Sequence, residues 1–143
     1  MDLIRVGLWR RLVAAAYDSF LLLALYFILG WGLVLLNDGA AVEGPWMFWF
    51  LIFVAWSFFV KFWCYPGQTL GMQVWKIKLV SESGQHVTLR QASMRFLLSM
   101  ISWGVFGLGF LWCLIDKEGR SWHDRLSQTK LVYIDHKKAK EAL

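Results

Sequence analysis

Asp18 is the residue whose type and position most directly suggest chemistry. It is the single charged residue between Arg11 and Asp38. A carboxylate at the centre of a membrane helix costs about 2.5–3.5 kcal/mol, so it needs a partner, a water-filled cavity or a proton. Arg11 precedes Asp18 by seven positions, which places both on nearly the same helix face and about 10 Å apart along the axis.

Two hypotheses for Asp18 follow from this position. The first is ion coupling, in which the carboxyl alternates between its protonated and its ionised form, as a proton-coupled cation carrier requires. The second is structural: Asp18 pairs with Arg95 or Arg11 and fixes the helices in register, as buried ion pairs do in some proteins. Asparagine at position 18 distinguishes the hypotheses, since it keeps the size and hydrogen bonding but cannot titrate.

The pair His123–Asp124 could suggest metal binding or acid–base catalysis. The two other histidines, His86 and His136, do not stand at ligand spacing, and a metal site needs more ligands than one His and one Asp. The sequence also contains no nucleophile motif, phosphate loop or nucleotide fingerprint. It therefore predicts no enzyme, no metal and no cofactor.

A structural interpretation of this segment is favoured. Either Asp124 or Asp116 is expected to cap a short helix at the membrane surface, or to pair with Arg120 or Arg125.

The elements that must position these residues are membrane helices. Hydrophobic residues make up 58% of the 143 residues, and charged residues only 17%. Apart from Asp18, residues 12–37, 44–60 and 96–115 are uncharged, and about 20 apolar residues span a bilayer. The alternatives are an unusually apolar soluble domain and, for the first run, a cleaved signal peptide. That run is too long for a typical signal peptide and carries Asp18.

The basic residues are distributed unevenly around these runs. Three precede the first run, none lies in 37–45, five lie in 61–95 and seven follow residue 115. The positive-inside rule then predicts a bacterial inner-membrane protein with its N-terminus in the cytoplasm and the 37–45 loop outside. The formal charge of +5 is therefore interpreted as a signal of topology and anionic lipid, not of nucleic-acid binding.

The third apolar run is predicted to bend rather than to cross directly. It contains Gly104, Gly107 and Gly109 near its middle, and glycines permit sharp turns. A full crossing would also place seven basic residues outside. We expect a strongly bent or re-entrant helix and a cytoplasmic C-terminus, with a plain third span as the alternative.

Short β-structure is predicted at the cytoplasmic surface. Apolar residues alternate with lysines in 73–80, turn residues follow in 81–85, and 86–89 could form the returning strand of a hairpin. Residues 131–134 could add a third strand. The predicted fold is thus an all-α membrane protein with two transmembrane helices, a third bent, re-entrant or spanning apolar helix, and a small β-hairpin.

Three stretches of the sequence share an order with one known family. They contain Arg11 and Asp18 in the first stretch; Gly67, Thr69, Gly71 and the later Arg95 in the second; and Asp116, His123, Asp124 and Thr129 in the third. Together they resemble the RDD family of multi-pass membrane proteins over nearly the whole chain. The resemblance implies a single RDD-type domain in 1–134, followed by a basic tail in 135–143.

The resemblance implies roles for some of these residues. The family name denotes one Arg and two Asp, which correspond to Arg11, Asp18 and Asp124, with Asp116 as the competitor for the last position. Met72 stands where the family often has Lys, and Ser127–Gln128 where it often has Ala-Gly. Gly67, Thr69 and Gly71 are interpreted as a turn that aims the β-structure, or as a small anion-binding nest.

The predicted function is a structural or interaction component of the membrane, acting as a homo-oligomer or with another membrane protein. The alternative is an oligomeric monovalent cation/proton exchanger that uses Asp18, since some family members have been proposed to exchange such cations for protons. A third hypothesis is a lipid-binding module whose basic segments contact anionic headgroups.

Overall fold

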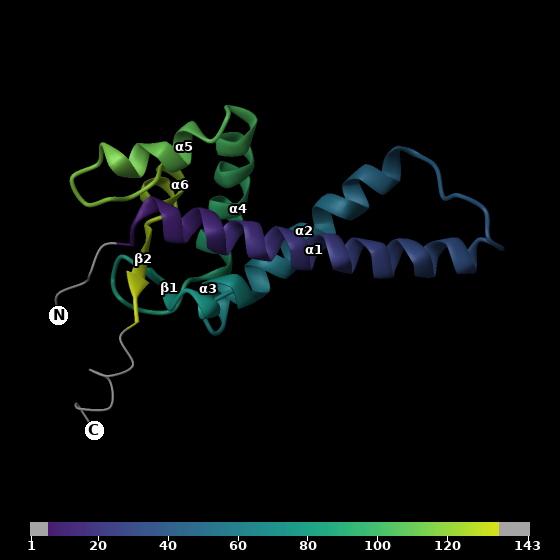
Figure 1. The fold of residues 1–143 in the computed structure, drawn as a ribbon, viewed down its shortest axis with the longest axis horizontal. Helices are drawn as coiled ribbons and strands as arrows, with labels where there is room; N and C mark the ends of the chain where they lie inside the picture. The colour runs from purple at the N-terminus through teal and green to yellow at the C-terminus, as the bar shows by residue number, and fades with distance from the viewer. Residues whose placement is uncertain (1–5, 135–143) are drawn as a thin grey trace, which may run out of the picture.

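Two long helices dominate the computed structural model, which describes residues 6–134 (Figure 1). They are α1 (Leu8–Leu36) and α2 (Pro45–Cys64). With 29 and 20 residues, both helices are long and apolar enough to cross a membrane, because a helix rises about 1.5 Å per residue. Pro45 begins α2, where its missing N–H costs no helical hydrogen bond. The two predicted spans are confirmed.

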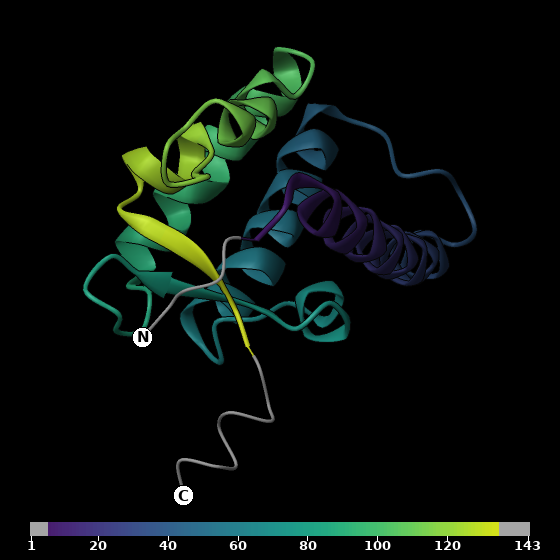
Figure 2. The same cartoon turned by 60° about the vertical axis from the view of Figure 1, so that its left-hand side comes forward.

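The third apolar run is broken. Helix α4 (Leu89–Gly104) is followed by α5 (Leu108–Leu111) and the 3₁₀ turn η1 (Trp112–Leu114), and the two parts meet at a bend of 106°. Gly107 adopts the left-handed conformation at this bend, with φ of 75°. Figure 1 shows α4 rising steeply and the chain turning from its top toward α5, and Figure 2 shows the same turn from another side. The predicted bent helix is confirmed.

A small antiparallel sheet joins two distant parts of the chain. It consists of β1 (Ile77–Ser81) and β2 (Thr129–Tyr133), with Ile77 opposite Tyr133 and Ser81 opposite Thr129. Along β1, buried residues alternate with partly buried ones, as the alternating sequence predicted. The strand begins only at Ile77, however, because residues 73 and 74 end a short helix. The strand predicted within 131–134 is thus present. It is the direct partner of β1 rather than a third strand.

The returning strand predicted in 86–89 is wrong. Thr88 is instead the N-cap of α4, in a capping box with Gln91: the Thr88 side chain accepts from the Gln91 N–H, and the Gln91 side chain accepts from the Thr88 N–H. This box satisfies two backbone donors that would otherwise lack partners. It also commits the segment to a helix start, so the predicted hairpin does not form.

The remaining elements form a cap around the N-terminal half of α1. Short helices α3 (Leu70–Val74) and α6 (Trp122–Leu126) lie with the sheet near that end, while the C-terminal half of α1 extends away from them (Figure 1). Ile77 and Leu79 of β1 and Ala92 of α4 are at most 1% exposed in the hydrophobic core that these elements share with α4. We call these elements, α3, β1, α6 and β2, the cap.

The β1–β2 pairing places both strands on one side of any bilayer. The segment between α2 and α4 therefore shares a side with the chain that follows α6. This agrees with the bent third run, because a complete crossing would separate the two strands. The basic tail predicted in 135–143 lies outside the described residues.

We predict that a reporter inserted after Gly84 and one fused after Leu143 report the same compartment, whereas one inserted after Gly39 reports the opposite one. Alkaline phosphatase and green fluorescent protein fusions measure the two locations. Expected are fluorescence at the first two positions and phosphatase activity at the third. Phosphatase activity after Leu143 would contradict both the bent helix and the cytoplasmic orientation.

Candidate functional site

Asp124 lies at the centre of a buried polar cluster. Its side chain is fully buried, and its Oδ2 accepts a hydrogen bond from Arg11 Nη1 at 2.5 Å. Its Oδ1 accepts one from Arg95 Nη1. The Ser121 N–H also donates to Oδ2, at 3.1 Å, as part of the capping box that begins α6. One carboxylate thereby fastens α1, α4 and α6 together.

The two arginines differ in how many of their N–H donors have hydrogen-bond partners. Arg11 also donates from Nη2 to the Gly119 carbonyl at 2.8 Å and from Nε to the Val6 carbonyl at 3.2 Å. Arg95 Nη1 also donates to Thr129 Oγ1 at 3.2 Å. Arg95 Nε is buried and has no hydrogen-bond partner among the described residues.

Hydroxyl groups complete this cluster. His123 Nε2 lies 2.9 Å from Ser121 Oγ, and Ser127 Oγ donates to the His123 carbonyl. Ser127 Oγ also lies 2.8 Å from Thr129 Oγ1, which contacts Arg95. Sequence reasoning missed Ser121 and treated Ser127 as a departure. The spacing Ser-x-x-Asp before α6 could have indicated the first, because it is typical of a capping box.

The cluster carries one excess positive charge. Burial raises the pKa of Asp124, but the Arg95 and Arg11 guanidinium groups outweigh it and hold the pKa below its usual range. Burial first, and the Arg95 and Arg11 guanidinium groups after it, lower the pKa of His123 to about 3, against a smaller opposing effect of Asp124. At neutral pH, two guanidinium groups therefore face one carboxylate and a neutral imidazole.

Asp18 is held by a second set of contacts. It is 3% exposed and accepts a hydrogen bond from Thr69 Oγ1 at Oδ2 and one from the Gly71 N–H, 2.9 Å away, at Oδ1. Thr69 is the N-cap of α3, where its side chain accepts from the Met72 N–H at 3.3 Å. The Gly-x-Thr-x-Gly element thus binds a carboxylate of the chain itself.

Glycine is required at position 71. A Cβ there would lie 2.4 Å from the Ala14 carbonyl oxygen and 3.0 Å from Asp18 Oδ1. Any larger residue would push α3 away from α1. Gly67 has φ of 85°, a conformation that side chains disfavour, so the element also makes the predicted turn.

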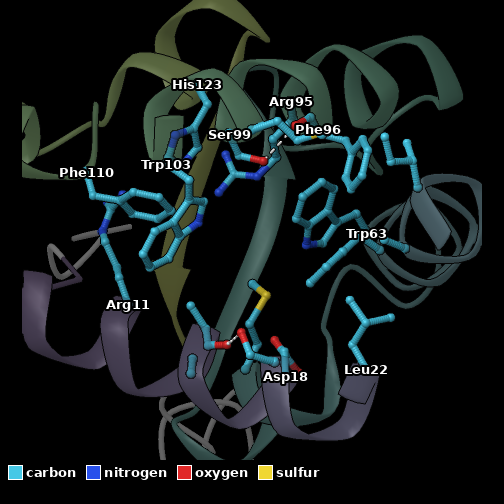
Figure 3. Close-up of a pocket in the computed structure, with 18 of the residues that line it drawn as sticks. Arg11, Asp18, Leu22, Trp63, Arg95, Phe96, Ser99, Trp103, Phe110 and His123 are labelled. Atoms are coloured by element: carbon cyan, nitrogen blue, oxygen red, sulfur yellow. Dashed lines mark hydrogen bonds between the residues drawn. The ribbon is translucent and has the colours of Figure 1, made fainter. Parts of the chain in front are cut away.

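A cavity of about 510 Å³ lies between α1, α2 and α4. Arg11, Arg95 and His123 of the first cluster line it, as does Asp18 of the second. Figure 3 shows Arg95 and His123 on the side of the cavity opposite Asp18 and Leu22. The remaining walls are mostly apolar. Four of the residues that the sequence singled out therefore meet around one space, whereas Asp124, Asp116, Thr129 and the Gly-x-Thr-x-Gly element do not line it.

The sequence model of the RDD family matches residues 5–128. The chain belongs to the RDD family. None of the curated proteins and none of the solved structures that were compared with the chain matches it. The matched region of this RDD protein includes both polar clusters except for Thr129.

The pairing predicted for Asp18 is wrong. Within the described chain no ion pair joins Asp18 to Arg11 or Arg95, because both guanidinium groups are directed to Asp124. The cap supplies two neutral donors to Asp18 instead. Hydrogen bonds from neutral groups therefore anchor this side chain.

Asp116 and Asp124 make different contacts. Asp124 caps α6, as predicted, but pairs with Arg11 and Arg95 rather than with Arg120 or Arg125. It is Asp116 that accepts from the Arg120 N–H at 2.9 Å and lies 3.5 Å from Arg125 Nη1. The hydrogen bond from the Arg120 N–H lowers the pKa of Asp116 most. The Glu118 N–H and the guanidinium groups of Arg125 and Arg120 lower it further.

In residues 6–134, no group of three or more His, Cys, Asp or Glu side chains is placed to hold a metal.

We predict that Asp124→Ala lowers the free energy of unfolding by about 3–5 kcal/mol, because it leaves two buried arginines without their counter-ion. The control is Glu82→Ala, which removes the exposed Glu82–Arg120 pair and should cost at most about 1 kcal/mol. Unfolding in detergent micelles, followed by Trp fluorescence, measures both. Equal losses of unfolding free energy in the two variants would contradict the proposed importance of Asp124 for the fold.

We also predict that stability falls on acidification from pH 6.5 to pH 5. The unfolded chain binds a proton at His123 near pH 6.5, whereas the folded chain does so only near pH 3, so the slope approaches about 1.4 kcal/mol per pH unit. The lowered pKa of Asp124 acts in the same direction, but only near and below the ordinary pKa of 3.8.

The His123→Gln variant should lose most of this slope, since glutamine does not titrate. The control variant His86→Gln removes an exposed histidine, and its stability should keep the same dependence on pH as the wild type. The unfolding free energy at pH 7, 6 and 5 provides the comparison. A slope that survives His123→Gln would show that another group is responsible.

Proposed function

We propose that this RDD protein is a structural or interaction component of the bacterial inner membrane, with both termini in the cytoplasm, and that it performs no catalysis. The observation that carries the proposal is that both buried carboxylates make contacts within the chain. Asp18 and Asp124 each accept hydrogen bonds that fasten the cap to α1. The interior polar groups thus serve to build a rigid platform at one end of the spans.

The outer surface of α1 supports the same proposal. None of the most apolar 18-residue stretch of α1 is buried within the chain, and Phe20, Phe27 and Trp31 are 70–73% exposed. Lipid or another helix must cover this surface. Two spans and a bent helix also enclose little space by themselves, so we infer that α1 contacts a second membrane helix, with a second copy of the chain as the first candidate.

We predict that Phe27→Cys, in a chain with Cys64 and Cys113 replaced by alanine, forms cross-linked dimers in native membranes when a short bis-maleimide is added. The matched control is Leu22→Cys on the same helix, which lines the internal cavity and should stay monomeric. Only monomers in both variants, with no co-purifying membrane protein, would contradict the proposal.

Cation/proton exchange is the second candidate, and one specific observation favours it. Asp18 lines the 510 Å³ cavity between the helices, where a carboxyl could exchange a proton for a cation. The two hydrogen bonds that Asp18 accepts weigh against exchange, because a bound cation would have to displace them or share the same oxygens.

Proton flux in everted vesicles distinguishes the candidates. The structural proposal predicts that pulses of sodium, lithium or potassium give no dye signal above that of empty vesicles. A cation-dependent signal that is lost in Asp18→Asn at matched expression would replace the structural proposal with exchange. The Asp18→Asn chain should still fold, since an amide oxygen can accept the hydrogen bond from Thr69 or from the Gly71 N–H.

A further inference from the structure

The cavity between α1, α2 and α4 opens through apolar side chains. Four of its lining residues, Leu23, Phe48, Met100 and Trp103, are between 42% and 62% exposed. They belong to α1, α2 and α4, the three helices that surround the space. Because α1 and α2 are long and apolar enough to cross a membrane, and α4 passes the same test together with α5 and η1, we infer that this rim faces hydrocarbon. A pocket of about 300–1,000 Å³ with mostly apolar walls is the usual form of a small-molecule site.

The inner end of the cavity is charged. Arg95 is 5% exposed and lines the space, and its buried Nε donor has no partner among the described residues. Figure 3 shows the Arg95 side chain beside Ser99, with Trp63 across from it. The Arg95 guanidinium also lies 5.2 Å from the centre of the Trp63 ring.

The charge at this end is not balanced nearby. Arg11 and Arg95 share the single carboxylate of Asp124, and an uncompensated buried charge is costly. Asp18 lies on the opposite wall, and its contacts go to Thr69 and Gly71. An anion next to Arg95 would supply both the missing counter-charge and an acceptor for Nε.

We propose that this cavity binds an anionic phospholipid, with the headgroup phosphate against the Arg95 guanidinium and one acyl chain along the apolar walls. Each part of the site matches one part of such a molecule. Basic pockets between membrane helices on the cytoplasmic side are suited to anionic headgroups, and the apolar rim admits an acyl chain directly from the bilayer. The proposal does not rest on self-association or on ion exchange.

The variant Ser99→Phe tests the site. Ser99 lines the cavity next to Arg95 and makes only a local hydrogen bond to the Phe96 carbonyl. A phenyl ring there fills part of the cavity that the acyl chain would occupy, and Ser99 is not one of the hydrogen-bond partners of Asp124. The matched control is Leu97→Phe, which places the same ring at an exposed position of the same helix. Ala15→Phe, on the opposite wall, is a second blocking variant should Ser99→Phe not fold.

The full chain is purified in mild detergent and given dioleoyl phosphatidylglycerol, dioleoyl phosphatidylethanolamine or oleate. Native mass spectrometry counts bound lipid, and thermal unfolding measures stabilisation. We expect one retained phosphatidylglycerol per chain and a raised melting temperature in wild type and Leu97→Phe. Ser99→Phe or Ala15→Phe should lose both effects.

Three outcomes would overturn the proposal. Equal retention of phosphatidylethanolamine would show that the headgroup charge is not recognised. Undiminished phosphatidylglycerol binding by the folded blocking variants would place the lipid on the outer surface of the helices. Stabilisation by oleate alone would assign the site to a free fatty acid rather than to a phospholipid.

Discussion

The carboxylate of Asp124 is the group on which the arrangement of this domain depends. It is fully buried, and a buried carboxylate remains ionised only if opposite charge lies close to it. Arg11 and Arg95 supply that charge from two different helices. Because each of these guanidinium groups would be equally costly to bury alone, the three side chains form a unit in which every member requires the others. That mutual requirement holds the start of α1, the second turn of α4 and the short helix α6 in one relative position.

The contacts of Asp18 make a second attachment along α1. Whereas Asp124 is bound by charge, Asp18 is bound by a hydroxyl and a backbone N–H, and the close approach depends on the absence of a side chain at Gly71. The two attachments lie about two helical turns apart on α1. Two fixed points define the direction of a helix as well as its position, so the cap sets how α1 leaves it.

The sequence predicted the apolar elements well and the pairing of the polar ones poorly. Uninterrupted apolar runs and a cluster of glycines are local properties, so the two spans and the bend near Gly107 could be inferred. Arg11 and Asp124 are 113 positions apart, and sequence spacing cannot select between two candidate carboxylates at that distance. The strand predicted in 86–89 was wrong because Thr88 and Gln91 form a capping box, a local signal that should have outweighed β-propensity.

The distribution of polar contacts also limits where this protein can act. The buried charged side chains, Arg11, Asp18, Arg95 and Asp124 among the described residues, all lie where the cap meets the first turns of α1 and α4. Beyond that region, α1 presents only an apolar surface. The buried charges are thus concentrated at the inner end of the cavity, whereas the exposed length of α1 offers apolar side chains for contact with lipid or with another membrane helix. The contacts of Asp18 and Asp124 fix the cavity and the exposed length of α1 relative to each other. The two spans alone would lack these contacts.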